Sequence, residues 1–284
     1  MRVVILPLRH AKVLNNDKLG TFLSGDIAMS QIADTDKRTP RRLSHTLQSR
    51  LITVQEIQPL TPHLLRILFS GDALSGFDSP GFDDHVKLCF PDPHSGEIIL
   101  PGSGGEKKPL MREYTPRYFD SQTNILAIDF VLHNAGIATQ WASNAKPGDT
   151  LGMAGPKNSF IIPLNFDWHL LIGDDTALPA IARRLEELPD TTQAIVIAEV
   201  DTPADEIILT SNATVKIYWL HRHGSAPGSA DLFLQKLQKI NFPAGDYYSW
   251  AACEYSAIKL LRAALTDKYG VNPQWLRAAS YWQK

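Results

Sequence analysis

Hydrophobic and polar residues alternate in short runs through residues 46–163, and a period of two is typical of β-strands. Turn signals such as Gly71-Asp72 and Pro147-Gly148-Asp149 separate these runs. One helical segment, residues 136–145, interrupts them. The pattern therefore predicts an antiparallel β-barrel over residues 46–163. The expected strands are residues 51–57, 64–70, 86–90, 125–132, 150–154 and 159–162.

From residue 164 to 284 the pattern changes, because apolar strands now alternate with amphipathic helices. This alternation predicts a doubly wound parallel sheet with helices on both faces, as in NAD(P)H-binding-like domains. The fold class is thus a β-barrel followed by an α/β domain. The expected strands are 168–173, 194–200, 215–220, 247–252 and 275–281, and the expected helices are 177–188, 230–240 and 255–269.

Residues 1–45 show weak periodicity and a basic stretch that ends at Arg41 and Arg42. We interpret them as a mobile N-terminal arm or an upstream extension, with Met29 as an alternative start.

Composition narrows the function classes. The net charge is −2 and the pI about 6.5, which argues against a protein whose whole surface binds nucleic acid. The only cysteines, Cys89 and Cys253, form no metal-binding or disulfide pattern, so a reducing cytoplasm is expected. No apolar run reaches the length of a membrane span.

The ends of the expected parallel strands carry small, polar and charged residues. In such a sheet, ligands bind beyond the carboxyl ends of the strands. The glycine-rich dinucleotide motif GxGxxG is absent. The nicotinamide site is expected at the ends of the first and fourth strands, on Gly173, Asp175, Thr176, Ala177, Cys253 and Glu254.

Two barrel segments carry the chemistry of a flavin site. Arg112, Tyr114 and Thr115 combine positive charge, an aromatic ring and a hydroxyl within four residues. His133 ends a strand just before a glycine turn and a helix, whose free N–H groups can bind phosphate with help from the Thr139 hydroxyl.

These segments, in this order, resemble the siderophore-interacting protein family of FAD-binding ferric reductases, within the ferredoxin–NADP reductase-like superfamily. The resemblance runs from about residue 45 to the end. Further matching segments are Gly81–Leu88, Asp129–Trp141, Ala154-Gly155-Pro156-Lys157, Gly173–Ala182, Trp219–Arg222 and Ala278–Trp282. The resemblance implies that FAD is bound by His85, Arg112, Tyr114, Thr115, Asp129, His133, Gly136, Ala138, Thr139 and Trp282, with Trp282 stacking near the flavin ring.

The same resemblance places a basic siderophore triad on Lys87, Lys157 and Arg277. Cations around an open cleft attract an anionic catecholate complex of iron(III) without removing the metal. Two lysines and one arginine favour charge attraction over bidentate geometry.

Three positions depart from the family pattern. Ile137 and Thr139 stand where proline and serine are usual, which changes the phosphate loop. Cys253 stands where glycine is usual, and its side chain is expected either to crowd the nicotinamide or to be a small buried residue.

The expected function is a ferric-siderophore reductase in which FAD passes electrons from NAD(P)H, or from a ferredoxin, to iron(III) in a catecholate or hydroxamate siderophore. The flavin carries the chemistry, so neither a catalytic side chain nor a protein metal ligand is expected. Two alternatives stay open: a flavin reductase for a protein partner, and a siderophore-binding protein without enzymatic activity.

Overall fold

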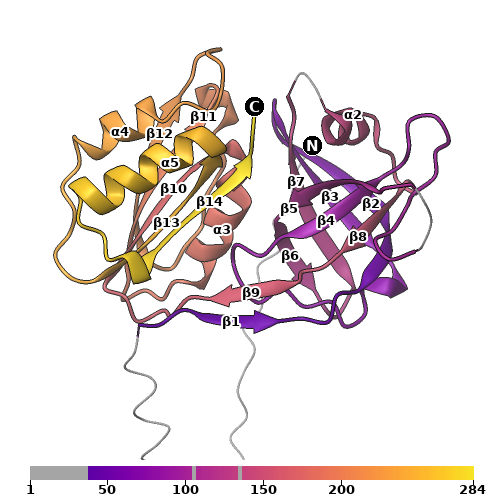
Figure 1. Ribbon diagram of the computed structural model, residues 1–284, viewed down its shortest axis with the longest axis horizontal. Coiled ribbons are helices and arrows are strands. Elements are labelled where there is room, and N and C mark those ends of the chain that lie inside the picture. The colour runs from indigo at the N-terminus through magenta and orange to yellow at the C-terminus, as the bar shows by residue number, and fades with distance from the viewer. Residues whose placement is uncertain (1–37, 104–106, 134–135) are drawn as a thin grey trace, which may run out of the picture. The chain divides into compact units, whose positions relative to one another are not determined.

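The structure is a computed structural model that describes residues 38–103, 107–133 and 136–284, so most of the expected arm lies outside the described residues. A curled antiparallel sheet comes first along the chain and a parallel α/β sheet follows (Figure 1). The predicted fold class is confirmed. No helix among the described residues is long and apolar enough to cross a membrane.

Seven antiparallel strands curl around the core of the first half, in the order β5-β4-β8-β2-β3-β7-β6. Successive side chains of a strand point to opposite faces, and this explains which residues are buried. Ile52 and Val54 point into the core, whereas Leu51 points outward and is 53% exposed. The short helix α2 (Ile137–Asn144) contributes Ala138 and Ala142 to the same core. The strands are β2 (Ser49–Thr61), β3 (Leu64–Ser70), β4 (Val86–Phe90), β5 (Leu110–Tyr114), β6 (Pro116–Asp120), β7 (Ile125–Val131) and β8 (Thr150–Ala154).

The edge strands β5 and β6 were not among the strands expected from the sequence. β5 is mostly exposed and therefore lacks an apolar alternation. The position of β5 is set by its pairing with β4, in which Tyr114 lies opposite Val86 and Arg112 lies opposite Leu88. The segment expected to carry the flavin chemistry is thus the exposed edge of the barrel.

A second two-stranded sheet joins β1 (Arg41–Ser44) to β9 (Asn158–Ile161). The sequence placed residues 41–44 in the arm, whereas the structure pairs them as a strand. A four-residue, fully exposed strand leaves no hydrophobic period to detect. Arg38, just before it, forms ion pairs with Asp167 and Asp246 of the α/β half.

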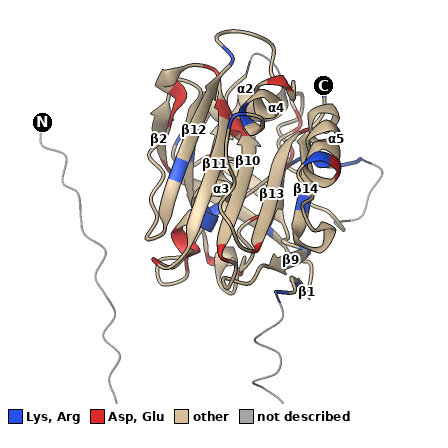
Figure 2. Cartoon of the chain, turned by 90° about the vertical axis from the view of Figure 1, so that its left-hand side faces the viewer, with Lys and Arg blue, Asp and Glu red and all other residues tan. Residues whose placement is uncertain are grey.

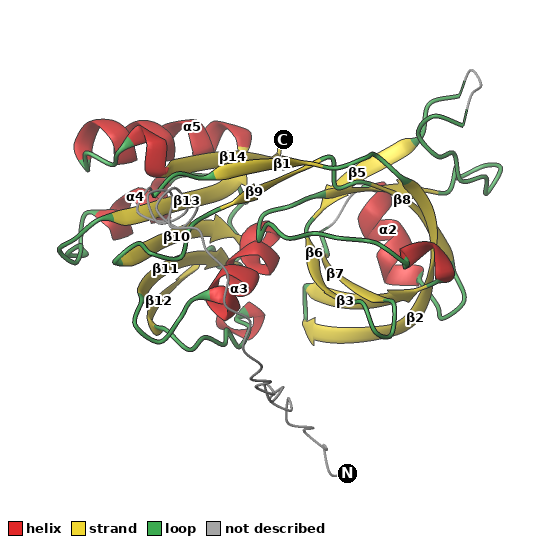
Figure 3. Cartoon of the chain, turned by 90° about the horizontal axis from the view of Figure 1, so that it is seen from below, coloured by secondary structure: helices red, strands yellow, loops and turns green. Residues whose placement is uncertain are grey.

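Five parallel strands form the second half, in the order β12-β11-β10-β13-β14 (Figure 2). Numbered along the chain, this order is 3-2-1-4-5, that of doubly wound nucleotide-binding folds. Helix α3 lies between this sheet and the barrel, and α4 and α5 cover the opposite face (Figure 3). The elements are β10 (Trp168–Asp174), α3 (Leu178–Glu187), β11 (Gln193–Val200), β12 (Thr214–His221), α4 (Asp231–Leu237), β13 (Tyr247–Glu254), α5 (Tyr255–Ala263) and β14 (Leu276–Trp282).

The end of β10 shows why glycine stands at position 173. A Cβ atom there would lie 2.3 Å from the Cβ of Ala177 and 3.0 Å from the carbonyl oxygen of Ala252. Asp174 then stabilises the following turn by accepting hydrogen bonds from the backbone N–H and the hydroxyl of Thr176. The chain can therefore turn sharply from the strand toward α3.

Candidate active site

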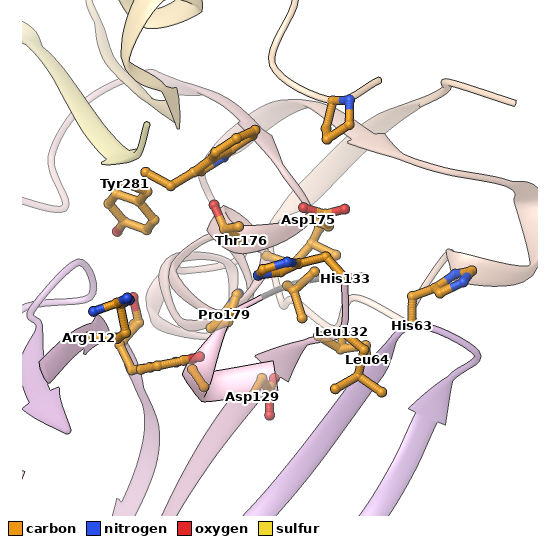
Figure 4. Close-up of a pocket in the computed structure, with 18 of the residues that line it drawn as sticks. His63, Leu64, Arg112, Asp129, Leu132, His133, Asp175, Thr176, Pro179 and Tyr281 are labelled. Atoms are coloured by element: carbon orange, nitrogen blue, oxygen red, sulfur yellow. The ribbon is translucent and has the colours of Figure 1, made fainter. Parts of the chain in front are cut away.

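A cavity of about 800 Å³ lies between the barrel and the α/β half. This volume is in the range of cofactor sites. Arg112 and Tyr281 are at one end of the close-up view and His63 is at the other, with Thr176 and His133 between them (Figure 4). Residues from both halves of the chain therefore line one continuous cavity.

The barrel wall of the cavity begins on β5. Arg112 donates a hydrogen bond to the carbonyl oxygen of Met111 but forms no ion pair with a described residue. Tyr114 packs against Phe130 with ring centroids 4.6 Å apart, and burial raises the pKa of its hydroxyl. Thr115 is buried next to it. The wall thus offers the cation, the aromatic ring and the hydroxyl expected from the sequence.

The N-terminal end of α2 continues this wall, where His133, Gly136 and Ala138 line the cavity. Gly136 has a φ of 116°, and a Cβ atom there would lie 3.2 Å from Cε1 of His133. Thr139 does not line the cavity itself, but its hydroxyl is buried and no described residue hydrogen-bonds to it. A buried hydroxyl in the first turn of a helix that opens on a cavity fits a phosphate ligand.

Asp129 and His85 also line the cavity. His85 is exposed in the segment before β4. The buried carboxylate of Asp129 accepts two hydrogen bonds from Arg66, at 2.7 and 2.8 Å. This bidentate pair compensates the charge of Asp129 inside the barrel wall.

The α/β wall carries a network of paired charges. Arg222 lies 2.9 Å from Asp175 and 3.4 Å from Glu199. Burial raises the pKa of Glu199 to about 7, although Arg222 opposes this shift. Burial and the neighbouring Asp175 raise the pKa of Asp174 to about 7.

The C-terminal segment folds back across the ends of the strands. The indole Nε1 of Trp282 donates a hydrogen bond of 2.8 Å to Asp174, and the ring of Tyr281 packs edge-on against Trp250. Both Tyr281 and Trp282 line the cavity. The residue expected near the flavin ring thus lies at the junction of β10, β14 and the cavity.

Of the residues expected to bind the nicotinamide, Asp175 and Thr176 line the cavity, but Gly173, Ala177, Cys253 and Glu254 do not. Gly173 and Ala177 shape the turn after β10. The thiol of Cys253 is buried in the core beneath α4 and α5, and burial raises its pKa. Glu254 caps α5 by accepting hydrogen bonds from the N–H groups of Ser256 and Ala257. Of the two readings of Cys253, the geometry agrees with the small buried residue.

The three expected siderophore cations do not share one wall. Arg277 lines the cavity, whereas Lys87 and Lys157 are exposed outside the residues that line it. Lys87 lies 3.6 Å from Glu113. All three nevertheless lie in or beside residues 154–160: Lys157 belongs to this segment, Lys87 is opposite Ala154 in the sheet, and the Arg277 guanidinium lies 4.1 Å from the ring centre of Phe160.

The structure also brings together residues that the sequence did not single out. The His63 ring donates or accepts a 2.8 Å hydrogen bond with Asp205, and with Asp201 these residues form a group of metal-binding side-chain types within 4.8 Å. Asp205 also accepts hydrogen bonds from Thr202, so it is already engaged. Because 142 residues separate His63 from Asp205, no local motif could have indicated this contact.

The two halves match two families. Residues 53–160 match the siderophore-interacting FAD-binding domain, and residues 166–284 match the siderophore-interacting protein family. The NADPH-dependent ferric-chelate reductase of Escherichia coli is 35% identical over 86% of this chain and 97% of its own length. The ferric vibriobactin reductase of Vibrio cholerae is 31% identical over 83% of this chain and 89% of its own length.

A solved structure agrees with these relatives. A siderophore utilization protein from T. fusca is 37% identical and has a TM-score of 0.81, over 86% of this chain and 96% of its own. The class is that of a barrel joined to a nucleotide-binding-like α/β domain. The chain belongs to the siderophore-interacting protein family.

Proposed function

We propose that this protein is a ferric-siderophore reductase that uses FAD and a reduced nicotinamide. The observation that carries this proposal is the single cavity, which joins Arg112 and the start of α2 on the barrel to Asp175 and Thr176 on the α/β half. The names of the Escherichia coli and Vibrio cholerae relatives support it. Residues 46–163 then form the FAD-binding part, and residues 164–284 form the NAD(P)H-binding-like part.

The barrel wall fits FAD. Among the described residues, Arg112 has no carboxylate partner and the buried Thr139 hydroxyl has no hydrogen-bond partner, and Gly136 carries no side chain at the start of α2. In the proposed site these groups hold the pyrophosphate, Tyr114 and Thr115 border the flavin, and Trp282 covers it from the C-terminal side. When bound, FAD would accept two electrons as a hydride from the donor and pass them singly to iron(III).

The α/β residues position the electron donor. Thr176 and Asp175 lie where dinucleotides bind in sheets of this strand order, at the end of the first strand. Because Arg222 already holds Asp175 and Glu199, these side chains are fixed before a donor arrives. Fixed dipoles and charges orient a donor without further reorganisation.

The substrate is a ferric siderophore, an anionic catecholate or a hydroxamate complex, which is bound by Lys87, Lys157 and Arg277. Hard oxygen ligands bind iron(II) less tightly than iron(III), so reduction releases the metal. We place the reaction in the cytoplasm, because Cys89 and Cys253 are free, buried thiols.

A donor and acceptor panel tests the proposal. The purified protein should carry FAD, be reduced anaerobically by NADH or NADPH, and then be reoxidised by ferric catecholate or hydroxamate complexes. Reduction only by a reduced ferredoxin changes the donor but keeps the reaction. Reoxidation by an electron-transfer protein and by no ferric chelate overturns the proposal, and so does a protein that binds no flavin.

A further inference from the structure

Asp83 is a buried carboxylate at the edge of the cavity, in the segment before β4. Its side chain is 1% exposed, and the residue lines the cavity beside Arg277. One of its oxygens, Oδ2, accepts hydrogen bonds from Nε of Arg277 and from Nε1 of Trp250, the latter at 3.1 Å. No described residue hydrogen-bonds to its other oxygen, Oδ1. Asp83 therefore joins the barrel to β13 and β14 of the α/β half.

The contacts of Arg277 leave one part of its side chain free for a ligand. Asp83 holds the Nε edge, and the guanidinium lies over the ring of Phe160. The side chain is 28% exposed, and its terminal nitrogens form no hydrogen bond with a described residue. These nitrogens are the groups that bind oxygen anions in a fork-like geometry.

The same contacts determine how much positive charge Arg277 contributes to the cleft. A carboxylate in direct contact with a guanidinium leaves the pair formally neutral, and its burial weakens screening by solvent. By contrast, Lys157 has no described counter-ion, and Lys87 lies beside the exposed Glu113. Arg277 can therefore offer hydrogen bonds to a chelate while adding little to the positive field of the cleft.

We propose that Asp83 is a specificity-determining residue, which offsets the charge of Arg277 and so sets how strongly the cleft prefers anionic over neutral ferric chelates. This inference rests on the proposed function. It has a chemical consequence: reduction of iron adds one negative charge to the chelate. A cleft with fewer uncompensated cations holds the more anionic product less tightly, which favours its release.

Four proteins form a charge series at the pair: Asp83→Asn at +1, wild type and the double variant Asp83→Asn/Arg277→Gln at zero, and Arg277→Gln at −1. The probes are a trianionic ferric triscatecholate and a neutral ferric trihydroxamate, and the readout is the dissociation constant at low and high salt. At low salt, Asp83→Asn should bind the trianion about fivefold more tightly than wild type, and Arg277→Gln about fivefold more weakly. Binding of the neutral chelate should change less than about twofold, and salt should remove the differences.

The matched control is Asp84→Asn. Asp84 is also buried, but it does not line the cavity and accepts its hydrogen bonds from Ser79, Gly81 and Ser159. This variant should bind both chelates as wild type does. An equal effect of Asp84→Asn would show that any buried charge in this turn acts alike, which overturns the special role of Asp83.

If the unpaired arginine keeps Asp83→Asn from folding, the double variant decides, because it leaves no uncompensated charge. It should bind the trianion within about twofold of wild type. Binding as weak as in Arg277→Gln alone overturns the inference. A wild-type protein that binds neither chelate defeats the proposed function itself, whereas a wild type that binds with a flat series defeats only the role of Asp83.

Discussion

The two walls of the cavity treat charge differently. On the barrel side, Arg112 lines the cavity and the Thr139 hydroxyl is buried in the first turn of α2, and neither has a partner among the described side chains. On the α/β wall, Arg222 is shared by Asp175 and Glu199, and Asp174 is held by Thr176 and Trp282. The barrel side thus keeps groups without a partner, whereas the charges at the ends of β10, β11 and β12 are paired within the α/β half.

This difference fits two kinds of ligand. A buried polar group without a partner is costly, so an incomplete wall gains most from a ligand that stays bound. A wall whose charges are already paired gains less from each ligand, and it suits a donor that binds and leaves. The contrast supports the proposal that the permanent cofactor binds to the barrel and the exchanging donor to the α/β half.

The largest effect is expected on the barrel wall. The double variant Arg112→Ala/Thr115→Ala should bind FAD at least about 100-fold more weakly, because it removes a charge-assisted and a neutral hydrogen bond in a partly buried site. Flavin absorbance of the purified protein and titration with FAD measure this. Arg117→Ala is the matched control, since Arg117 is bound to Glu186 and does not line the cavity. Full occupancy in the double variant would refute the flavin assignment.

The next effect concerns the three expected siderophore cations, of which only Arg277 lines the cavity. Replacing Lys87, Lys157 and Arg277 together by glutamine should weaken binding of a ferric triscatecholate about 30-fold at low salt, at roughly 1 kcal/mol or less for each partly exposed charge. Flavin content and reduction by the donor should stay unchanged. A triple variant that binds the triscatecholate as tightly as wild type would place the chelate elsewhere.

A smaller effect is expected on the pH dependence of stability, and it tests the buried carboxylate of Asp174 at the end of β10. The folded pKa of Asp174, about 7, lies above its ordinary value, so its contribution to stability is complete below about pH 4 and is lost as pH rises through 7. Asp174→Asn removes this dependence. Relative to wild type, the variant should therefore gain about 1 to 2 kcal/mol of unfolding free energy between pH 6 and pH 8. Urea unfolding at these pH values measures it, and a constant difference would speak against the raised pKa.

The smallest effect is expected at Cys253, which lies in the core beneath α4 and α5. Cys253→Ala should leave the rate of flavin reduction by NAD(P)H within about twofold of wild type. Stopped-flow absorbance under anaerobic conditions measures the rate. A several-fold faster reduction would revive the expectation that this thiol crowds the nicotinamide.

Much of this architecture follows from sequence period, and the exceptions have physical causes. The core strands and helices bury one face each, so Ile52, Leu171 and Ile181 mark them in the sequence. No residue of β1 or β5 is fully buried, so only pairing with β9 and β4 defines these strands.

The candidate site likewise contains residues that local sequence patterns indicate and residues that only the folded structure brings together. Arg112, Tyr114 and Gly136 belong to local segments and were found from them. The Asp83–Arg277 pair, the His63–Asp205 contact and the Trp282–Asp174 hydrogen bond each join residues more than 100 positions apart. The first two contacts depend on how the two halves pack, and the third depends on where β14 lies in the α/β sheet; no local pattern records either.

Single-turnover stoichiometry tests the central claim most directly. The protein is reduced anaerobically with one equivalent of NAD(P)H per flavin and mixed with a ferric triscatecholate and a colourless iron(II) trap. The account predicts full reoxidation of the flavin and about two iron(II) per flavin, since a hydride carries two electrons and each iron(III) accepts one. A flavin that the donor reduces but that stays reduced in the presence of the ferric chelate, with no iron(II) in the trap, would contradict it.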